Sequence, residues 1–372
     1  MGEIIGRGLD LCSQSREGNH TSMKIIQISP YFPPHVGGVE YHVKELADGL
    51  ANRGHQVSVA SSCGRWTGEL VRIPSIDLFY SPMPIKLPKL EADVYHSHIP
   101  SPLFAFMLRN ALPHVVTYHN DVVVPEIVNG HAMPRPFATA LERITEKIVR
   151  PVLEEAKIVI ATTKSYAETS PVLKDYLHKL KIVPNAVNVS LYPQFRKKEN
   201  YVLYAGRMLS YKGVESLLFA MSEVQKSADL DLLLVGDGYD RRLLEEMAKK
   251  LHVRAKFTGR LERSMFIDTI SRAEILVLPT QNRLEAFGIV LLEAMACETP
   301  VLAFDTPGVN EVAENGGMVY SSTEELSELI MELHENEPLR LLLGKKGRMA
   351  VEENYSWKRV LDCMESVYRE VA

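Results

Sequence analysis

The stretch that most constrains the fold is residues 275–304, where an apolar run, a polar loop, a helical apolar pattern and a second apolar run follow one another. The first run, residues 275–278, is typical of a buried strand. A strand, a helix and another strand in this order favour a parallel sheet, and the order recurs in residues 24–60. We therefore predict an α/β fold with doubly wound parallel sheets.

The loop that enters the helix of this stretch has the features of a ligand site. In a doubly wound sheet it lies at the carboxyl end of its strand, where ligands bind. The amides of Gly288 and Ile289 point out of the positive end of the helix and suit a phosphate, and a glycine lets the backbone come close. Glu285 and Glu293 suit sugar hydroxyls, because a carboxylate accepts O–H donors with charge-assisted strength. Exposed glutamates on a solvated helix face are the alternative interpretation.

Length and composition indicate the class of protein. The 372 residues suffice for two domains with substantial cores, and 46% hydrophobic and 24% charged residues are typical of a soluble globular protein. The net charge of −5 argues against nucleic-acid binding, which needs a basic excess. The four cysteines lie far apart without a C-x-x-C pair, so we expect a reducing cytoplasm and neither a disulfide framework nor structural zinc. No apolar run reaches the length of a membrane-spanning helix.

The chain is expected to divide into two domains after a short extension. Residues 1–22 are polar and lack the apolar centre of a signal peptide, and we expect them to be disordered and upstream of the true start. Residues 23–192 form the expected N-terminal domain. A polar, charged stretch at residues 193–200 is typical of a linker and opens the expected C-terminal domain, residues 193–356.

Two features of the N-terminal half follow predicted strands. Gly37 and Gly38 come after the first strand, in place of a complete dinucleotide fingerprint, and either a turn or a ligand loop accounts for them. His98 and His119 lie at the carboxyl ends of later strands, where a histidine is a better functional candidate than on a helix face, although many such histidines only hydrogen-bond a loop. His96 and His98 have the spacing of two zinc ligands on a strand, but no third ligand is evident, so no metal site is predicted.

A loop in the C-terminal half concentrates positive charge. Gly206 and Arg207 follow a predicted strand at residues 201–205, and Lys212 precedes the next helix. An arginine offers a planar fork and a lysine a compact charge, so together they can neutralise a diphosphate. For either residue alone, a surface ion pair is the simpler interpretation.

Together these motifs resemble those of the retaining nucleotide-sugar glycosyltransferases of family 4. Glu285 and Glu293 match the E-x7-E motif of that family, with its common Glu-Ala-Phe-Gly opening. Residues 206–213, Gly-Arg-x4-Lys-Gly, are similar to its phosphate-binding loop. The chain departs from the family's I-P-N-G-V-D segment in having Ala186 for Gly and Asn188 for Asp. The resemblance covers the chain from the first predicted strand to the end.

The resemblance implies the GT-B fold, in which two Rossmann-like domains face each other across a deep cleft and a final helix, here residues 357–372, packs back on the first domain. The catalytic residues it implies are His119, Arg207, Lys212 and Glu285. The residues it implies for donor binding are Gly37, Gly38, Gly206, Arg207, Lys212, Arg260, Leu261, Phe287, Gly288, Ile289 and Glu293. In these roles Glu285 orients sugar hydroxyls and Glu293 holds the ribose. Arg260 and Leu261 lie beside the base.

The implied reaction moves a hexosyl or N-acetylhexosaminyl group from a UDP- or GDP-sugar to an acceptor hydroxyl, with retention and with no metal or further cofactor. The acceptor is lipid-linked, a free sugar or a small metabolite. Two alternatives stay open: a nucleotide-sugar epimerase on the same scaffold, and a non-catalytic nucleotide-sugar binding subunit of a larger complex. A dinucleotide dehydrogenase is less favoured, because no complete glycine fingerprint occurs.

Residues 133–156 show a long helical pattern with an apolar stripe. The stripe comprises Phe137, Leu141, Ile144 and Ile148. We predict that this face packs on the core. The alternative is a basic amphipathic helix that touches an anionic membrane through Arg143, Lys147 and Arg150. We therefore expect a cytoplasmic protein whose contact with a membrane, if it has one, is peripheral.

Overall fold

The computed structural model describes residues 21–35, 37–78, 81–99, 102–124, 127–128, 131–194 and 197–372. Apart from Thr21 and Ser22, the extension expected at residues 1–22 lies outside the described residues. The chain divides into two compact units. The first unit comprises Met1–His119, Thr145–Asn185 and Trp357–Ala372, and the second comprises Asn120–Ile144 and Ala186–Ser356. The chain thus enters the main part of the second unit earlier than the boundary expected after residue 192.

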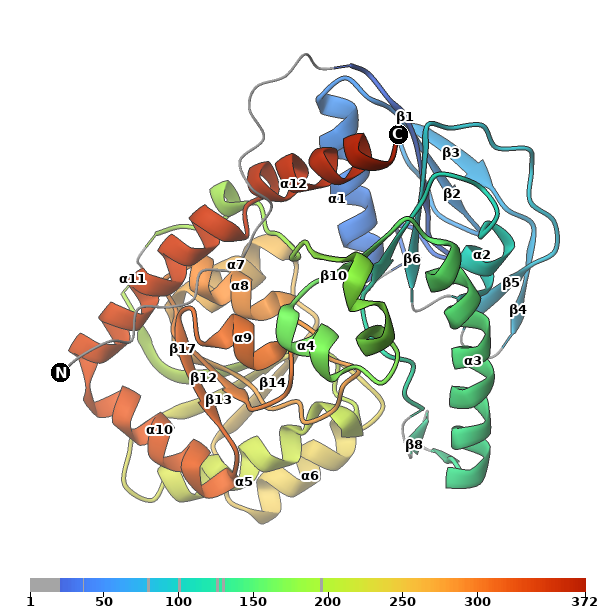
Figure 1. Ribbon diagram of the computed structural model, residues 1–372. Helices are drawn as coiled ribbons and strands as arrows, with labels where there is room; N and C mark the ends of the chain where they lie inside the picture. Colours follow the sequence, from blue (N-terminus) through green and yellow to red (C-terminus); the bar gives the residue numbers. More distant parts are fainter. Residues whose placement is uncertain are drawn as a thin grey trace. The chain divides into compact units, whose positions relative to one another are not determined.

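The first unit is built on a seven-stranded parallel sheet in the order β11-β10-β7-β6-β1-β2-β3 (Figure 1). Its strands are β1 (Lys24–Ile28), β2 (Gln56–Ser61), β3 (Glu69–Arg72), β6 (Val94–Ile99), β7 (His114–Tyr118), β10 (Ile158–Ala161) and β11 (Leu180–Ile182). An antiparallel pair, β4 (Ser75–Leu78) with β5 (Ser81–Pro84), accompanies the sheet. The helices are α1 (Gly38–Asn52), α2 (Pro102–Met107), α4 (Lys164–Thr169), α12 (Trp357–Val371) and the second part of α3 (Arg135–Glu155).

The second unit has a six-stranded parallel sheet in the order β14-β13-β12-β15-β16-β17. Its strands are β12 (Glu199–Ala205), β13 (Asp231–Val235), β14 (Ala255–Gly259), β15 (Ala273–Leu278), β16 (Val301–Phe304) and β17 (Gly317–Tyr320). The helices are α5 (Val214–Val224), α6 (Arg241–Lys250), α7 (Arg263–Arg272), α8 (Ile289–Ala296), α9 (Val309–Ala313), α10 (Thr323–Glu335) and α11 (Glu337–Asn354). The short antiparallel pair β8 (Ile127–Val128) and β9 (His131–Ala132) belongs to the segment Asn120–Ile144.

Alternation along the strands builds a core on each face of the second sheet. In β12, Leu203 and Ala205 join one apolar cluster, and Val202 and Tyr204 join another. All residues of β15 are buried, which explains why the sequence shows a continuous apolar run there instead of alternation. Two parallel sheets with crossover helices confirm the predicted α/β fold.

The last helix, α12, lies beside α1 in the first unit (Figure 1). Gly49 makes this approach close, since a Cβ at that position would stand 2.6 Å from Leu361 Cδ1. At the end of α1, Arg53 Nη1 donates to Asp362 Oδ1 at 2.7 Å. Although the second unit precedes it in the chain, α12 contributes its buried face to the first unit.

The helix α3 is exposed where a buried face was predicted. Phe137 and Ile144 are 49% and 55% exposed, whereas Val152 and Leu153 near its end are fully buried. The prediction that the apolar stripe faces the core is therefore wrong for Phe137 and Ile144. Helical spacing places apolar side chains on one face, but it does not show what covers that face.

No helix in the described part of the chain is both long enough and apolar enough to cross a membrane.

Candidate active site

Two loops of the second unit meet at the carboxyl edge of its sheet. One joins β12 to α5 and carries Gly206, Arg207 and Lys212, and the other joins β15 to α8 and carries Glu285 and Gly288. Because β12 and β15 are parallel neighbours, both loops leave the sheet at the same edge. The sheet therefore brings together predicted site residues that are far apart in the sequence.

Lys212 and Glu285 form an ion pair between these loops, in which the Lys212 ammonium donates to Glu285 Oε2. Their side chains are only 12% and 21% exposed. Burial by itself lowers the pKa of Lys212, but the facing Glu285 carboxylate outweighs it, so the pKa lies above its usual value. Lys212 is therefore a fixed positive charge at neutral pH.

Gly288 shapes the start of α8. Its φ of 77° lies in the left-handed region that favours glycine, and a Cβ would stand 2.6 Å from Leu278 Cδ2. The Gly288 amide donates to Glu285 Oε1 at 3.1 Å, so in this structure it is occupied by a carboxylate and not open to a phosphate. Ile289, the first residue of α8, stands at the amide end of the helix, where the first N–H groups have no partner within the helix.

Arg207 is exposed, and its guanidinium donates to the Tyr211 hydroxyl at 2.8 Å. The loop around it packs closely because of Gly213, whose φ is 69°. A Cβ on Gly213 would stand 2.3 Å from the carbonyl oxygen of Pro279. The absence of a side chain thus lets the β12–α5 loop rest directly on the backbone that follows β15, with Arg207 at the surface beside Lys212.

Glu293 lies in α8 and is held by two residues that the sequence did not single out. Its Oε1 accepts from the Tyr192 hydroxyl at 2.9 Å and from Arg263 Nη1 at 2.6 Å. Burial raises the pKa of the Tyr192 hydroxyl, so this phenol is a neutral donor. The signal that could have found Arg263 is its place at the start of α7, shortly after Leu261 at the carboxyl end of β14.

The remaining residues expected at the donor site have different surroundings. Arg260 is exposed beyond β14, and Leu261 is partly buried against the apolar core. Phe287 is 4% exposed, and its ring lies edge to face with Tyr355 at 6.0 Å between centroids. The Phe287 side chain therefore belongs to the core, and only its backbone is left to contact a ligand.

Gly37 and Gly38 follow β1 in the first unit. Gly38 is the first residue of α1, and Gly37 precedes it with an extended backbone. A Cβ on Gly37 would stand 2.1 Å from Glu40 Oε2, so the glycine makes room for this carboxylate, which pairs with His35 at 2.9 Å. The glycine pair thus lies at the start of α1, at the carboxyl edge of the first sheet.

A group of buried histidines lies at the same edge of the first sheet. His98 is in β6 and His119 directly follows β7, and His98 Nδ1 lies 3.0 Å from His119 Nε2. The other nitrogen of His98 lies 2.8 Å from Gln27 Oε1. Both ring nitrogens of His96 are hydrogen-bonded to hydroxyl groups at 2.7 Å, those of Tyr368 and Thr117. His98 is therefore hydrogen-bonded to His119 and not to His96, its neighbour in the i, i+2 spacing.

His42, from α1, is the third member of this group. Its ring centroid lies 5.8 Å from that of His98 and 5.1 Å from that of His119. Its Nδ1 is buried and has no hydrogen-bond partner among the described residues. His42, His98 and His119 each offer a nitrogen within 4.8 Å of the others, a group that leaves out His96, the partner of His98 in the pair considered from the sequence. Two of these nitrogens are already hydrogen-bonded to each other, and within the described chain no carboxylate joins the group.

Burial determines the charge of these histidines. It lowers the pKa of His42 to about 4, and it lowers the pKa of His98 and of His119 well below the usual 6.5. Neighbouring histidines lower the pKa of His98 and His119 further. All three imidazoles are therefore neutral at pH 7 and act as hydrogen-bonding groups without charge.

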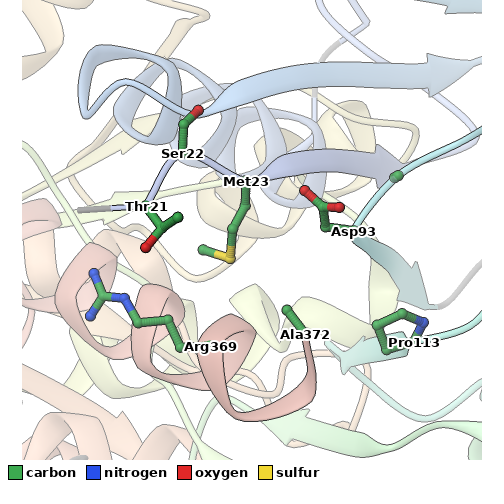
Figure 2. Close-up of a pocket in the computed structure, with 8 residues that line it drawn as sticks. Thr21, Ser22, Met23, Asp93, Pro113, Arg369 and Ala372 are labelled. Carbon is green, nitrogen blue, oxygen red and sulfur yellow. The ribbon is translucent and has the colours of Figure 1, made fainter. Parts of the chain in front are cut away.

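A hollow of about 540 Å³ lies elsewhere in the first unit, and no buried histidine lines it. Figure 2 shows the residues that do. Its lining includes Met23, Asp93 and Pro113, which directly precede β1, β6 and β7. The hollow is therefore at the amino edge of the sheet, opposite the edge where parallel α/β sheets bind their ligands. We do not assign it to the active site.

Two protein families match the chain in succession. The family described as Glycosyltransferase Family 4 matches residues 36–191, and the family described as Glycosyl transferases group 1 matches residues 193–350. The first match includes the buried histidines, and the second includes the Lys212–Glu285 pair.

Full-length relatives agree with these matches. The chain is 27% identical over 387 residues to phosphatidyl-myo-inositol mannosyltransferase of Mycobacterium tuberculosis, covering 94% of this chain and 97% of that protein. It is 24% identical over 377 residues to a subunit of human phosphatidylinositol N-acetylglucosaminyltransferase, covering 94% of this chain and 76% of that protein. A shorter match, 37% identical over 161 residues, is to a GDP-mannose-dependent mannosyltransferase of Corynebacterium glutamicum and covers 41% of this chain and 42% of that protein.

Solved structures share the fold. Sucrose-phosphate synthase from Thermosynechococcus elongatus matches with a TM-score of 0.74 and 22% identity over 93% of this chain and 98% of that one. HepE of Anabaena, solved with UDP, matches with a TM-score of 0.74 and 16% identity over 94% and 100%. At these identities the likeness concerns the fold.

Proposed function

Because the chain belongs to the group 1 glycosyltransferases of family 4, with the GT-B fold, we propose that it moves a hexosyl or N-acetylhexosaminyl group from a UDP- or GDP-sugar to an acceptor hydroxyl with retention of configuration. The observation that carries this proposal is the buried Lys212–Glu285 pair at the carboxyl ends of two adjacent strands. It places a cation for a phosphate beside a carboxylate for a sugar hydroxyl.

The chemistry proposed for this edge is stabilisation of the departing diphosphate. Negative charge grows on the diphosphate as the glycosidic bond breaks, and fixed donors lower the barrier most effectively there. Lys212, exposed Arg207 and the helix end at Ile289 supply the positive charge that stabilises the diphosphate, without a metal ion. A bound diphosphate competes with Glu285 for Lys212, and the released carboxylate can then accept hydrogen bonds from the donor sugar.

Glu293 is proposed to hold the ribose. Among the described residues only its Oε1 has partners, Tyr192 and Arg263, which leaves Oε2 to accept hydrogen bonds from the two ribose hydroxyls. Arg260 and Leu261, beyond the end of β14, are proposed to lie beside the base. The first unit contributes Gly37, Gly38 and the neutral His119, which is proposed to bind a hydroxyl of the transferred sugar.

The acceptor is proposed to be presented by a lipid headgroup. Two relatives that match over nearly the whole of this chain are named for phosphatidylinositol acceptors. The exposed Phe137 and Ile144 on α3, with Arg143 and Lys147 nearby in sequence, offer apolar and basic side chains for a peripheral contact with such a surface. Cys63 and Cys297 are free thiols, which supports a cytoplasmic location.

The test is an incubation with UDP-, GDP- and ADP-sugars in combination with pools of lipid and small-sugar acceptors. We expect acceptor-dependent release of one nucleoside diphosphate and a new glycoside by mass spectrometry, both lost in Lys212→Ala and Glu285→Ala. Lys226→Ala is the matched control, since Lys226 pairs with Glu223 on the exposed surface of the same unit.

Three outcomes would contradict the proposal. Conversion of the donor to its epimer without an acceptor would indicate the epimerase. Tight donor binding by folded protein without diphosphate release from any pool would indicate a non-catalytic subunit. Loss of activity on removal of divalent ions, with recovery on their return, would contradict the metal-independent mechanism.

A further inference from the structure

A continuous chain of hydrogen bonds runs from the last helix to His119 within the first unit. The Gln27 side chain donates from Nε2 to the Tyr368 hydroxyl at 2.9 Å. Gln27 Oε1 lies 2.8 Å from His98 Nε2, and His98 Nδ1 lies 3.0 Å from His119 Nε2. Gln27, His98 and Tyr368 are fully or almost fully buried, so water does not replace these partners.

The orientation of the Gln27 amide, with Oε1 toward His98 and Nε2 toward Tyr368, fixes the direction of the bonds. An amide oxygen only accepts, so the proton between Gln27 and His98 is on His98 Nε2. A neutral imidazole carries one proton, so His98 Nδ1 is a bare acceptor. The proton between the two histidines is therefore on His119 Nε2, and His119 Nδ1 carries a free lone pair.

A second branch follows from the same amide orientation. Because the Tyr368 hydroxyl accepts from Gln27, it donates its own proton to His96 Nδ1 at 2.7 Å. His96 Nε2 then carries the ring proton and donates to Thr117 Oγ1 at 2.7 Å. Each buried donor in this branch meets an acceptor, which is the condition for a stable buried network.

We propose that Gln27, His98 and Tyr368 are positioning residues that hold His119 in the tautomer with its proton on Nε2, so that Nδ1 accepts a hydrogen bond from a hydroxyl of the sugar. The proposal rests on the proposed role of His119 in sugar binding. It adds a direction, because the substrate must offer a donor at this point. The network that holds His119 extends through Gln27 to Tyr368 in α12, near the end of the chain.

The neutral state of His119 suits this role. Burial and the neighbouring imidazoles disfavour a charged ring. A cation here would oppose the positive charge that develops on a sugar as its leaving group departs, whereas a neutral acceptor does not. The tautomer matters because an Nδ1–H group would meet a sugar hydroxyl as a donor and leave the lone pair on the wrong nitrogen.

Metal binding by the same group is the competing state. A metal held by His42, His98 and His119 would take the lone pair of His98 Nδ1, since His98 Nε2 faces Gln27, and the same lone pair accepts from His119 in the hydrogen-bonded state. The hydrogen-bonded state and the metal-bound state therefore exclude each other, and a metal analysis of the purified protein distinguishes them.

The decisive measurement is the ¹⁵N chemical shift of the His119 ring nitrogens in the ligand-free protein at pH 7, assigned with a His119→Gln variant. We expect Nδ1 in the range of an unprotonated nitrogen and Nε2 in the range of a protonated one. Tyr368→Phe removes the hydroxyl that orients Gln27, so we expect the two shifts to move toward each other as both tautomers become populated. Tyr176→Phe is the matched control, because it removes a part-buried hydroxyl of the same unit that donates to the Arg150 carbonyl and lies outside this network.

Activity supplies a second readout. An asparagine in place of His98 puts an amide oxygen near the position of Nδ1, whereas a leucine offers no acceptor. We expect His98→Leu to lower kcat/KM about two- to tenfold relative to His98→Asn, the scale of one net hydrogen bond. If the protein has no transferase activity, the proposed function fails while the ¹⁵N measurement still tests the tautomer.

Three results would overturn the proposal. The first is a proton on Nδ1 of His119 in the wild type. The second is a Tyr368→Phe spectrum identical to that of Tyr176→Phe. The third is one equivalent of zinc in the purified protein that is lost in His42→Ala.

Discussion

The Lys212 ammonium and the Glu285 carboxylate are hydrogen-bonded across 73 residues of sequence, between loops that leave the adjacent strands β12 and β15. Each charge compensates the other in a largely buried setting. Such a pair adds little net stability, but removal of one partner leaves the other charge buried and unpaired. Lys212 is thus suited to exchange Glu285 for a negatively charged ligand.

Lys212→Met is expected to lower kcat by about 10² to 10³, the usual effect of removing one fixed donor to a developing negative charge. Glu285→Gln keeps the shape and one acceptor oxygen, so it is expected to lower activity with less loss of stability than Lys212→Met causes. Steady-state kinetics and urea unfolding measure both effects. Lys226→Met controls for the loss of a lysine, and an equal kcat in Lys212→Met and Lys226→Met would refute the role of Lys212.

Tyr192→Phe is expected to raise KM for the nucleotide sugar several-fold while kcat changes little. The hydroxyl of Tyr192 holds Glu293 Oε1 at 2.9 Å, and its loss frees the carboxylate to turn away from a ribose. A contact made equally in the ground state and the transition state affects KM alone. Tyr201→Phe is the control, since its hydroxyl bonds the Thr269 carbonyl at 2.6 Å in the same unit. A lower kcat with unchanged KM would point to a different role for Glu293.

Local pattern predicted the elements and the loops of this protein well, because parallel strands buried on both faces leave continuous apolar runs such as that of β15. The order of the elements also placed Lys212 and Glu285 at sheet edges, where neighbouring strands bring them together. The sequence pattern could not predict the partners of the site residues. Nothing near Glu293 in sequence indicates Tyr192, and nothing near His119 indicates His42, because tertiary packing alone makes these contacts.

The wrong prediction for α3 and the buried setting of Phe287 have a related cause. The apolar spacing of α3 correctly gave a helix, yet it could not reveal that Phe137 and Ile144 remain exposed. Phe287 lies inside the E-x7-E segment, and a motif does not state which of its side chains turn inward. Its ring packs on Tyr355, which is distant in sequence.

Gly213→Ala is expected to destabilise the second unit more than Gly54→Ala destabilises the first. Both glycines have positive φ, at 69° and 90°, so both substitutions carry the strain of a left-handed alanine, about 1 kcal/mol or more. Only at Gly213 does a Cβ also meet backbone, 2.3 Å from the Pro279 carbonyl oxygen, while nothing lies within 4 Å at Gly54. Urea unfolding of each variant gives the difference. Equal losses would show that the β12–α5 loop moves away from Pro279 without cost.

The first unit is expected to lose stability in mild acid because of its buried histidines. Burial lowers the pKa of His114 to about 4, and its Nε2 lies 2.8 Å from Ser97 Oγ. In the unfolded chain the same imidazole takes up a proton near pH 6.5. Since the unfolded state then binds more protons, the contribution of His114 is complete above about pH 6.5 and is lost as the pH falls toward 4.

The size of this loss follows from the same shift. Between pH 6.5 and 4 the free energy of unfolding should fall by about 1.4 kcal/mol per pH unit for each such histidine. His114→Gln removes one of them, so its stability should depend less steeply on pH than that of the wild type by about this amount. Urea unfolding at pH 8, where both proteins are neutral at this position, gives the cost of the substitution itself. Identical slopes from pH 6.5 to 5 would mean that His114 is protonated in the folded protein, and the buried neutral state would be wrong.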